Sequence, residues 1–292
     1  MILVTGVTGN TGTYVLKNLC ELVSSKNIVG IVRSNQYLNQ ENIQIESGDL
    51  TDLNFLESVY KKYNFEEVIH IANIRMSKNI MGLSEKYGVK RTILIHTTGV
   101  FSKYQEYSSL YNEIEESIIN TEFRNTSYVI VRPSMIYGNE RDYNMHRLIK
   151  FLSKSPVFPL FGDGKALMQP IHVEDLADAI CEIYKNKDII NEDFNITGAS
   201  ILEYQQIVEI ISKGINKSIM LIKIPIPLAI FAAKCARLVL RKSIITVEQI
   251  ERLQEDKAYS HEKATKIFDF SPRTFEQGIT EEIDILKKKG II

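Results

Sequence analysis

The sequence predicts an α/β protein built on a doubly wound parallel sheet, with a smaller α/β part towards the C-terminus. The chain opens with a short apolar run at residues 1–5, which a glycine-rich turn and an amphipathic helical pattern follow directly. Short apolar runs then alternate with segments of helical periodicity. This alternation predicts βαβ units with parallel strands and right-handed crossovers. Beyond Tyr137-Gly138 the pattern changes, which predicts the second, smaller part.

The individual elements follow from apolar runs, helical periodicity and turn residues. The expected strands are residues 1–5, 28–32, 43–45, 68–72, 91–97, 127–131 and 194–198. The expected helices follow the first turn and then cover residues 51–59, 78–87, 108–121, 144–152, 173–184, 202–212, 228–240, 247–253 and 275–287. Gly88 is the expected C-terminal cap of the third helix, because glycine readily adopts the left-handed conformation.

Composition and charge narrow the classes of protein and partner. The 292 residues carry a formal net charge of -1, so nucleic acid is not an expected partner. Three scattered cysteines and five scattered histidines predict neither a disulfide framework nor a metal site. The N-terminus has the pattern of a strand rather than a signal peptide, which indicates a cytoplasmic protein.

The most apolar stretch, residues 219–240, is interrupted by two lysines, an arginine and two prolines. It contains no uncharged run of the roughly eighteen residues that a membrane-spanning helix needs. We expect a buried helix there and no membrane contact. A helix that touches a membrane surface is the alternative interpretation.

The glycines of the first turn fit the binding of a dinucleotide pyrophosphate. Gly6 permits a tight turn, Gly9 lets a phosphate approach the backbone, and Gly12 lets the helix pack close to the strand. The N–H groups and positive dipole end of the helix would face the phosphates. The spacing is G-x-x-G-x-x-G rather than G-x-G-x-x-G, and a plain strand–turn–helix connection is the alternative. The other expected cofactor contacts of this turn are Thr8, Asn10 and Thr11.

The end of the second strand indicates which dinucleotide binds. Arg33 lies 21 positions after Gly12, near the distance of about 20 at which an acidic residue would bind the ribose of NAD. An arginine can instead contact the 2′-phosphate of NADP, and Ser34 can add a hydrogen bond. We therefore expect NADP(H) to be preferred over NAD(H), with a solvated surface arginine as the alternative. Asp49, which ends the next strand, is expected near the adenine.

Short motifs fall in order along nearly the whole chain. They are Thr5-Gly6-x-x-Gly9-x-x-Gly12, Gly48-Asp49-Leu50, Gly88-Val89-Lys90-Arg91, Arg132-Pro133-Ser134, Tyr137-Gly138, Gly162-x-Gly164, His172-Val173-Glu174-Asp175-Leu176-Ala177 and Ser271-Pro272-Arg273. In these motifs the chain resembles the short-chain dehydrogenase/reductase superfamily, in its extended or atypical branch, often labelled NAD-dependent epimerase/dehydratase. The N-terminal and Arg-Pro motifs are specific together, whereas each later motif is weak alone.

The resemblance implies a Rossmann-type fold, a nucleotide-sugar-like substrate and a homodimer. Residues 1–158 would form the dinucleotide-binding domain, which a return strand near 193–197 can join, and residues 159–292 the substrate-binding part. Substrate would lie between them, above the carboxyl ends of the strands. The remaining cofactor contacts would be Leu50, Ala72, Thr97, Pro133, Ser134 and Met135. Candidates to line the substrate pocket are Asn144, Met145, His146 and Gln169.

The catalytic motif of the family is only partly present. The family uses a Ser or Thr to hold the substrate oxygen, and a Tyr-x-x-x-Lys whose phenol exchanges a proton with it. Thr98 fits the hydroxyl role, with Thr97 as an alternative, and Tyr111 fits the tyrosine role. Glu115 stands where the lysine belongs, and a carboxylate beside a phenol disfavours the phenolate. Lys103 is the nearest candidate in sequence for a replacement cation; Tyr104 and Tyr107 are alternative acids.

This departure leaves three interpretations of the function. The first is an NAD(P)-dependent oxidoreductase, a reductase or epimerase, in which a neutral Tyr111 favours carbonyl reduction. The second is a sensor or assembly protein that binds NADP(H) without turning it over. The third is a membrane-peripheral structural subunit that uses residues 219–240. We favour the first.

Overall fold

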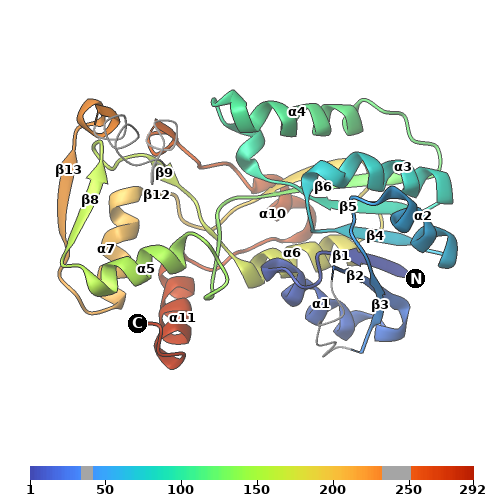
Figure 1. The fold of residues 1–292 in the computed structure, drawn as a ribbon, viewed down its shortest axis with the longest axis horizontal. Coiled ribbons are helices and arrows are strands. Elements are labelled where there is room, and N and C mark those ends of the chain that lie inside the picture. The colour runs from blue at the N-terminus through green and yellow to red at the C-terminus, as the bar shows by residue number, and fades with distance from the viewer. Residues whose placement is uncertain (34–41, 232–250) are drawn as a thin grey trace.

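The computed structural model describes residues 1–33, 42–231 and 251–292, and its centre is a parallel sheet of seven strands (Figure 1). Their spatial order is β11 (Glu192–Ile196), β6 (Ser127–Pro133), β5 (Arg91–Ile95), β4 (Glu67–His70), β1 (Ile2–Thr5), β2 (Ile28–Val32) and β3 (Gln44–Ser47). The chain runs outwards from β1 in both directions, so β1 and β4 flank the switch point of a doubly wound sheet. The predicted fold class is therefore confirmed.

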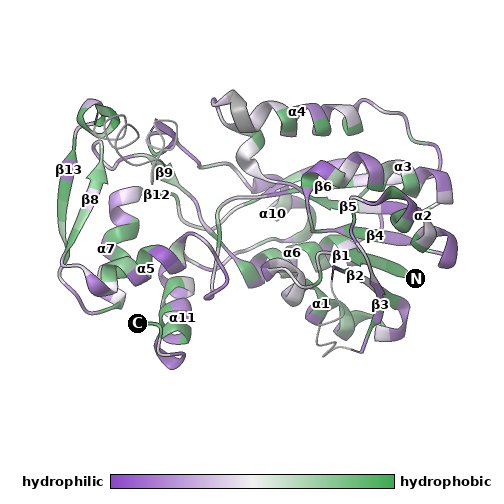
Figure 2. Cartoon of the chain, viewed as in Figure 1, coloured by the Kyte–Doolittle hydropathy of each residue, from purple (hydrophilic) through white to green (hydrophobic). Residues whose placement is uncertain are grey.

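Helices cover both faces of the sheet, as its apolar strands require. One face packs against α1 (Asn10–Leu22) and α6 (Val173–Lys185), with α10 (Glu262–Phe268) against β11. The other face packs against α2 (Leu53–Lys62), α3 (Ser77–Tyr87) and α4 (Gln105–Ile119). Figure 2 shows hydrophobic strands between helices whose outer sides are hydrophilic.

Local signals in the sequence fix several helix ends. The Asp52 carboxylate accepts hydrogen bonds from the backbone N–H groups of Asn54 and Phe55, so it caps the start of α2. Gly88 ends α3 with φ at +69°, the left-handed conformation predicted for it. His172 caps α6 by accepting from the N–H of Glu174.

The C-terminal part has its own core. Helices α5 (Met145–Lys154), α7 (Tyr204–Gly214) and α11 (Phe275–Lys288) enclose it with a parallel pair of strands, β8 (Val157–Phe161) and β13 (Met220–Ile224). Two further pairings of two residues each complete the strands: β7 (Ile136–Tyr137) with β10 (Ile171–His172), and β9 (Leu167–Met168) with β12 (Leu202–Glu203). This part lies to the left of the sheet in Figure 1.

The apolar stretch at residues 219–240 differs from the expected buried helix. Residues 220–224 of this stretch form β13, which pairs with β8. The strand ends before Pro225, because proline has no N–H group to donate to the ladder. A helical turn begins at residue 226. Residues 232–250, with most of the helices expected at 228–240 and 247–253, lie outside the described residues. Among the described helices, none combines the length and the hydropathy needed to cross a bilayer.

Candidate active site

The glycine turn between β1 and α1 has the geometry of a dinucleotide cradle. Gly6 has φ at +78°, and a Cβ there would lie 2.9 Å from the backbone nitrogen of Ala72. A Cβ on Gly12 would lie 2.0 Å from the Gly6 carbonyl oxygen. Gly6 and Gly12 are therefore required by the fold itself. At Gly9 an added Cβ would meet one atom, the Gly6 oxygen, at 3.0 Å, so the open side of the turn lies at Gly9.

The start of α1 has the features of an anion-binding site. Gly9 provides no side-chain cap, and the first turn of the helix has no acidic residue. The N–H groups at the start of the helix therefore face the open side of the turn with a positive dipole end. A pyrophosphate fits this arrangement, because it would supply the acceptors that a capping side chain supplies elsewhere. Asn10 and Thr11 of the same turn line the larger hollow described below.

The loop after β7 is fastened to this turn. The Asn139 amide donates to the Asn10 side-chain oxygen at 2.8 Å and to the Tyr14 hydroxyl at 3.2 Å. The Arg141 guanidinium donates to the carbonyl oxygen of Thr8. These contacts hold Arg141 at the edge of the turn, where its charge would face a bound phosphate.

Arg33 directly follows β2, the strand next to β1, and is exposed. Asp49 accepts hydrogen bonds from the backbone N–H and hydroxyl of Thr51, both at 2.8 Å. Those bonds, with a smaller contribution from the charge of Arg33, lower the pKa of the Asp49 carboxyl. Arg33 and Asp49 therefore lie together at the position expected for the adenosine. Leu50 follows Asp49, and Ser34 lies outside the described residues.

Two hollows adjoin above the carboxyl ends of the strands. The smaller, about 520 Å³, lies over β4, β5 and β6 and is lined by Ala72, Thr97, Tyr111 and Pro133 among others. The larger, about 920 Å³, opens towards the C-terminal part. The residues that line both are Thr11, His96, Thr97, Gly99, Pro133, Ile136 and Arg252. A dinucleotide that starts at Arg33 and crosses Gly9 would place its nicotinamide in the smaller hollow.

The expected catalytic side chains border these hollows. Tyr111, on α4, lines the smaller hollow. Thr98 lines the larger hollow and donates to the Pro133 carbonyl at 3.3 Å. Thr97 lines both, and its hydroxyl oxygen accepts from the Gly99 N–H at 3.1 Å. Of the two threonines, Thr97 therefore shares a hollow with Tyr111.

The larger hollow also contains Ser134 and Met135, together with two of the expected pocket residues, Asn144 and Met145. Gln169 instead bridges backbone segments: its side chain donates to the Gly198 carbonyl at 2.8 Å and accepts from the Tyr259 N–H at 2.9 Å. Lys103 has an exposed side chain and lies outside the linings of both hollows. The side chain of Tyr107 is outside the described set.

Glu115 belongs to a buried ion-pair network. Its carboxylate accepts from Arg132 at 2.6 and 2.8 Å and from Nδ1 of His96 at 2.9 Å. Arg132 also pairs with Asp193 on β11, and Nε2 of His96 lies 2.9 Å from the Ser77 hydroxyl. Burial works to raise the pKa of Glu115, but the hydrogen bonds from His96 and Arg132 outweigh it and keep the pKa below its ordinary value.

This network changes the interpretation of Glu115, which stands where the family has a lysine. The expected effect of Glu115 on the Tyr111 phenol assumed an uncompensated carboxylate. In the structure, the Arg132 guanidinium neutralises the Glu115 carboxylate, and both side chains are buried. The argument that favoured reduction over oxidation therefore loses its physical basis. The pairing was not visible in the sequence, although Arg132 directly after a buried run could have indicated a buried anionic partner.

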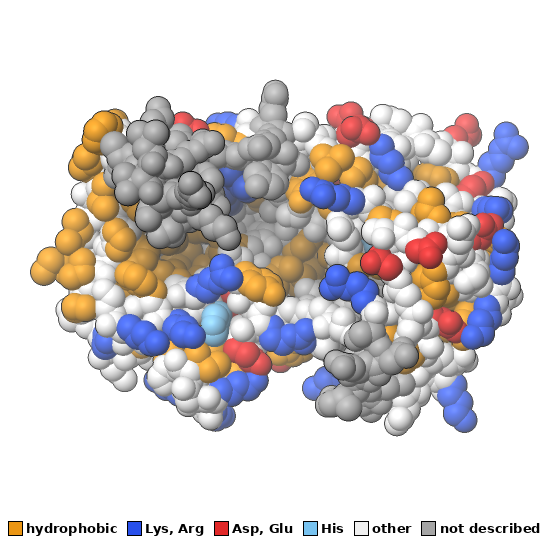
Figure 3. Space-filling model, in the orientation of Figure 1, with side chains coloured by type: hydrophobic (Ala, Val, Ile, Leu, Met, Phe, Trp, Pro, Cys, Tyr) orange, Lys and Arg blue, Asp and Glu red, His pale blue; other side chains and the backbone are white. Residues whose placement is uncertain are grey.

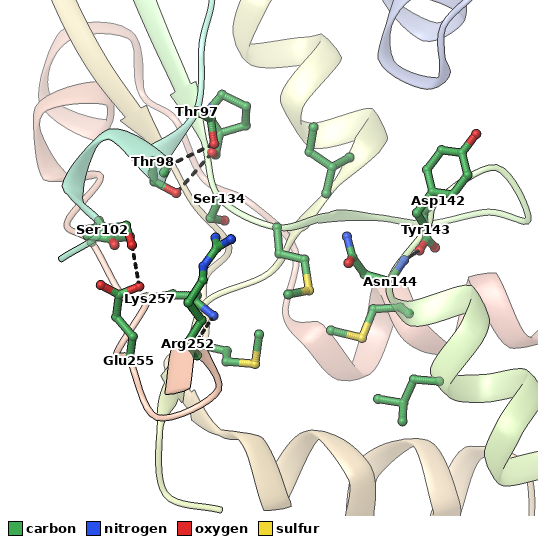
Figure 4. A pocket seen from close by; sticks show the side chains of 18 of the residues that line it. Thr97, Thr98, Ser102, Ser134, Asp142, Tyr143, Asn144, Arg252, Glu255 and Lys257 are labelled. Atoms are coloured by element: carbon green, nitrogen blue, oxygen red, sulfur yellow. Dashed lines mark hydrogen bonds between the residues drawn. The ribbon is translucent and has the colours of Figure 1, made fainter. Parts of the chain in front are cut away.

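A segment from the C-terminal part closes over the larger hollow. The Glu255 carboxylate accepts from the Ser102 hydroxyl at 2.9 Å and from the Lys103 N–H at 2.6 Å. Arg252 and Lys257 line the hollow, and Figure 4 shows their side chains beside Thr98 and Ser134. The Lys257 ammonium donates to the Arg252 carbonyl at 2.9 Å, and burial lowers its pKa.

The sequence analysis missed these two cations, because nothing in the pattern of residues 251–259 connects them with the loop after β5. The lining of the larger hollow contains three basic residues, Arg141, Arg252 and Lys257, and two acidic ones, Asp142 and Glu255. Such a lining suits a ligand that carries negative charge.

The glycine cradle and the parallel sheet are those of a Rossmann-type fold. The chain belongs to the NAD dependent epimerase/dehydratase family, whose model matches residues 2–197. The family resemblance and the epimerase-like enzyme class expected from the sequence are thereby confirmed.

Relatives of known function cover most of the chain. It is 21% identical to the N-acetyl-alpha-D-glucosaminyl-diphospho-ditrans,octacis-undecaprenol 4-epimerase of Escherichia coli O157:H7, over 95% of this chain and 92% of the relative. It is 23% identical to the UDP-glucuronate 4-epimerase of Thermodesulfobacterium geofontis (strain OPF15), over 74% and 80%. Its fold matches the UDP-glucose 4-epimerase of Thermotoga maritima, solved with UDP-glucose, with a TM-score of 0.77 and 17% identity over 99% of each chain.

Proposed function

We propose that the chain is an NAD(P)-dependent epimerase or reductase that acts on a hydroxyl or keto carbon of a sugar carried on a diphosphate. The observation that supports this most is the pair of adjoining hollows, with Tyr111 and Thr97 lining the smaller and three basic side chains lining the larger. The names of the two epimerase relatives described above contain sugars attached through a diphosphate.

Each part of the site would have its own binding role. The glycine turn and the start of α1 would hold the pyrophosphate, Ala72 and Pro133 would flank the nicotinamide, and Arg33 would favour NADP over NAD. The bound nicotinamide supplies hydride transfer. Arg141, Arg252 and Lys257 would hold the diphosphate of the substrate, since all three line the larger hollow.

Tyr111 would move the proton of the reacting oxygen, and a threonine would orient that oxygen. Thr98 was the first choice from sequence. Thr97 has a stronger geometric claim, because it borders the same hollow as Tyr111. Glu115 would take no direct part and would instead hold α4 to β6 through Arg132.

Single-turnover spectroscopy of the nicotinamide tests the proposal. The wild type would be loaded with NAD or NADP and mixed with a panel of nucleoside-diphosphate sugars, and Tyr111→Phe, Thr97→Ala and Thr98→Ala would be run beside it. We expect reduced nicotinamide in the wild type and its loss in Tyr111→Phe. Turnover that survives in all three variants would remove these site assignments. A wild type that binds the cofactor and stays silent on the panel would favour the sensor or assembly role.

A further inference from the structure

The outer face of the β8–β13 pair is apolar on both strands. Side chains alternate along a strand, and Phe158, Leu160 and Leu221 point inwards to the core of the C-terminal part. The register then places three apolar pairs on the opposite face: Val157 with Met220, Pro159 with Ile222, and Phe161 with Ile224. Met220 is 65% exposed and Ile222 46%. The other four residues of these pairs are half-buried, so within the described part of the chain Met220 and Ile222 form the exposed portion of this face.

The exposed apolar surface continues into the segment that follows β13. Leu228 is 57% exposed and Phe231 65%. We call the surface made by these two residues, Met220 and Ile222 the apolar end. Figure 3 shows hydrophobic side chains gathered at this extremity of the molecule, to the left of the hollow. Exposed apolar residues that occur singly are ordinary, but several together mark a site of interaction.

The two stretches of chain that build the apolar end are basic, and Asp142, Asp163 and Glu209 lie directly beside them in the sequence. These two stretches, residues 143–162 and 210–231, contain no Asp or Glu, although the whole chain has a net charge of -1. Their basic residues are Arg147, Lys150, Lys154, Lys213, Lys217 and Lys223. The Lys217 ammonium donates to the carbonyl of Ser153, which places it beside Lys154 at the end of α5. The two stretches therefore present their charge together.

We propose that the apolar end docks onto a lipid bilayer that contains anionic lipid. The exposed Met, Ile, Leu and Phe side chains would enter the boundary between headgroups and acyl chains, and the lysines would contact the anionic headgroups. Lysine suits this position because its stem lies along apolar surface while its ammonium stays in water. A second copy of the chain fits less well, since a two-fold interface would bring the same basic residues together.

Docking here would set the active site at the membrane surface. Phe161 ends β8 and also lines the larger hollow. The inference stands on the exposed surface and its charge, so it is independent of the proposed enzymatic function.

Co-sedimentation of the full chain with vesicles tests the proposal. One set of vesicles contains phosphatidylcholine alone and the other phosphatidylcholine with phosphatidylglycerol. We expect binding to the anionic vesicles, weaker binding to the neutral ones, and loss of binding as salt is raised. Met220→Ser/Ile222→Ser should weaken binding about tenfold or more. The matched control is Leu53→Ser/Ile119→Ser, which removes two comparably exposed apolar side chains on α2 and α4.

A second variant keeps the test valid if the serine pair impairs folding. Lys154→Gln/Lys217→Gln leaves the apolar side chains intact and should reduce binding to anionic vesicles alone. No binding by the wild type, or equal binding by Met220→Ser/Ile222→Ser and its control, would overturn the proposal. So would a dimer in sedimentation velocity that Met220→Ser/Ile222→Ser dissociates while vesicles leave it unaffected, because the occupant of the face would then be a second copy.

Discussion

Restoring the family's lysine at position 115 should destabilise the protein and not activate it. In Glu115→Lys a second cation would face Arg132 and His96 in a site where the Glu115 side chain is 6% exposed. Removing one partner of a buried ion pair costs about 3–5 kcal/mol, and here a like charge replaces it. At about 2–4 °C per kcal/mol, the melting temperature should fall by between about 6 and 20 °C.

Thermal unfolding followed by circular dichroism measures this, and α4 offers a matched control. Glu113→Lys makes the same change two residues away, where Glu113 is 72% exposed and pairs with Lys78 at 3.0 Å. Exposed pairs are worth about 0–1 kcal/mol, so Glu113→Lys should shift the melting temperature by a few degrees at most. If the two variants unfold alike, or if Glu115→Lys is stable and turns over faster, the structural role of Glu115 is refuted.

The other predictions concern the cofactor and the pH dependence of stability. Arg33→Ala should weaken NADP binding about ten- to a hundredfold and leave NAD binding nearly unchanged, since a hydrogen bond to a charged group contributes about 1.5–3 kcal/mol. Calorimetry measures both affinities, and a wild type that binds NAD more tightly than NADP would contradict this. Gly9→Val should abolish dinucleotide binding and still unfold cooperatively, whereas Gly12→Ala should lower stability because its Cβ would meet the Gly6 oxygen at 2.0 Å. Burial, with Asp142 beside it, raises the pKa of Glu282 from 4.5 to about 10. Between those pH values the folded state holds a proton that the unfolded chain has released, so the free energy of unfolding should fall as pH rises, by up to about 1.4 kcal/mol per unit. Glu282→Gln should flatten this slope in urea titrations, and an unchanged slope would assign it to other groups.

Much of the sheet could be predicted because its signals are local. Each of its strands is a short run bounded by turn residues, and Gly88 marks a helix end through its own backbone preference. The β8–β13 pair gave no such signal. Pro159 lies inside β8, and a proline within a run argues against a central strand. β8 tolerates it because the strand pairs on one side, with β13.

The candidate site was predictable where one segment carries it and unpredictable where distant segments meet. The glycine turn is read from seven consecutive residues, and Tyr111 from a family motif. Glu255 contacts Ser102 across 153 positions, and no local pattern records that approach. The ion pair between Glu115 and Arg132 likewise depends on how α4 lies against β6. A residue substitution that looked like a defect in the motif is part of a packed electrostatic network.

We propose that dinucleotide chemistry takes place where the two hollows meet. A crystal structure of the protein with NADP(H) or NAD(H) tests it most directly. The account predicts the pyrophosphate at Gly9 and the start of α1, and the nicotinamide ring in the smaller hollow, against Thr97 and within reach of the Tyr111 hydroxyl. A cofactor whose nicotinamide lies away from Tyr111, or whose phosphates bypass Gly9, would contradict it.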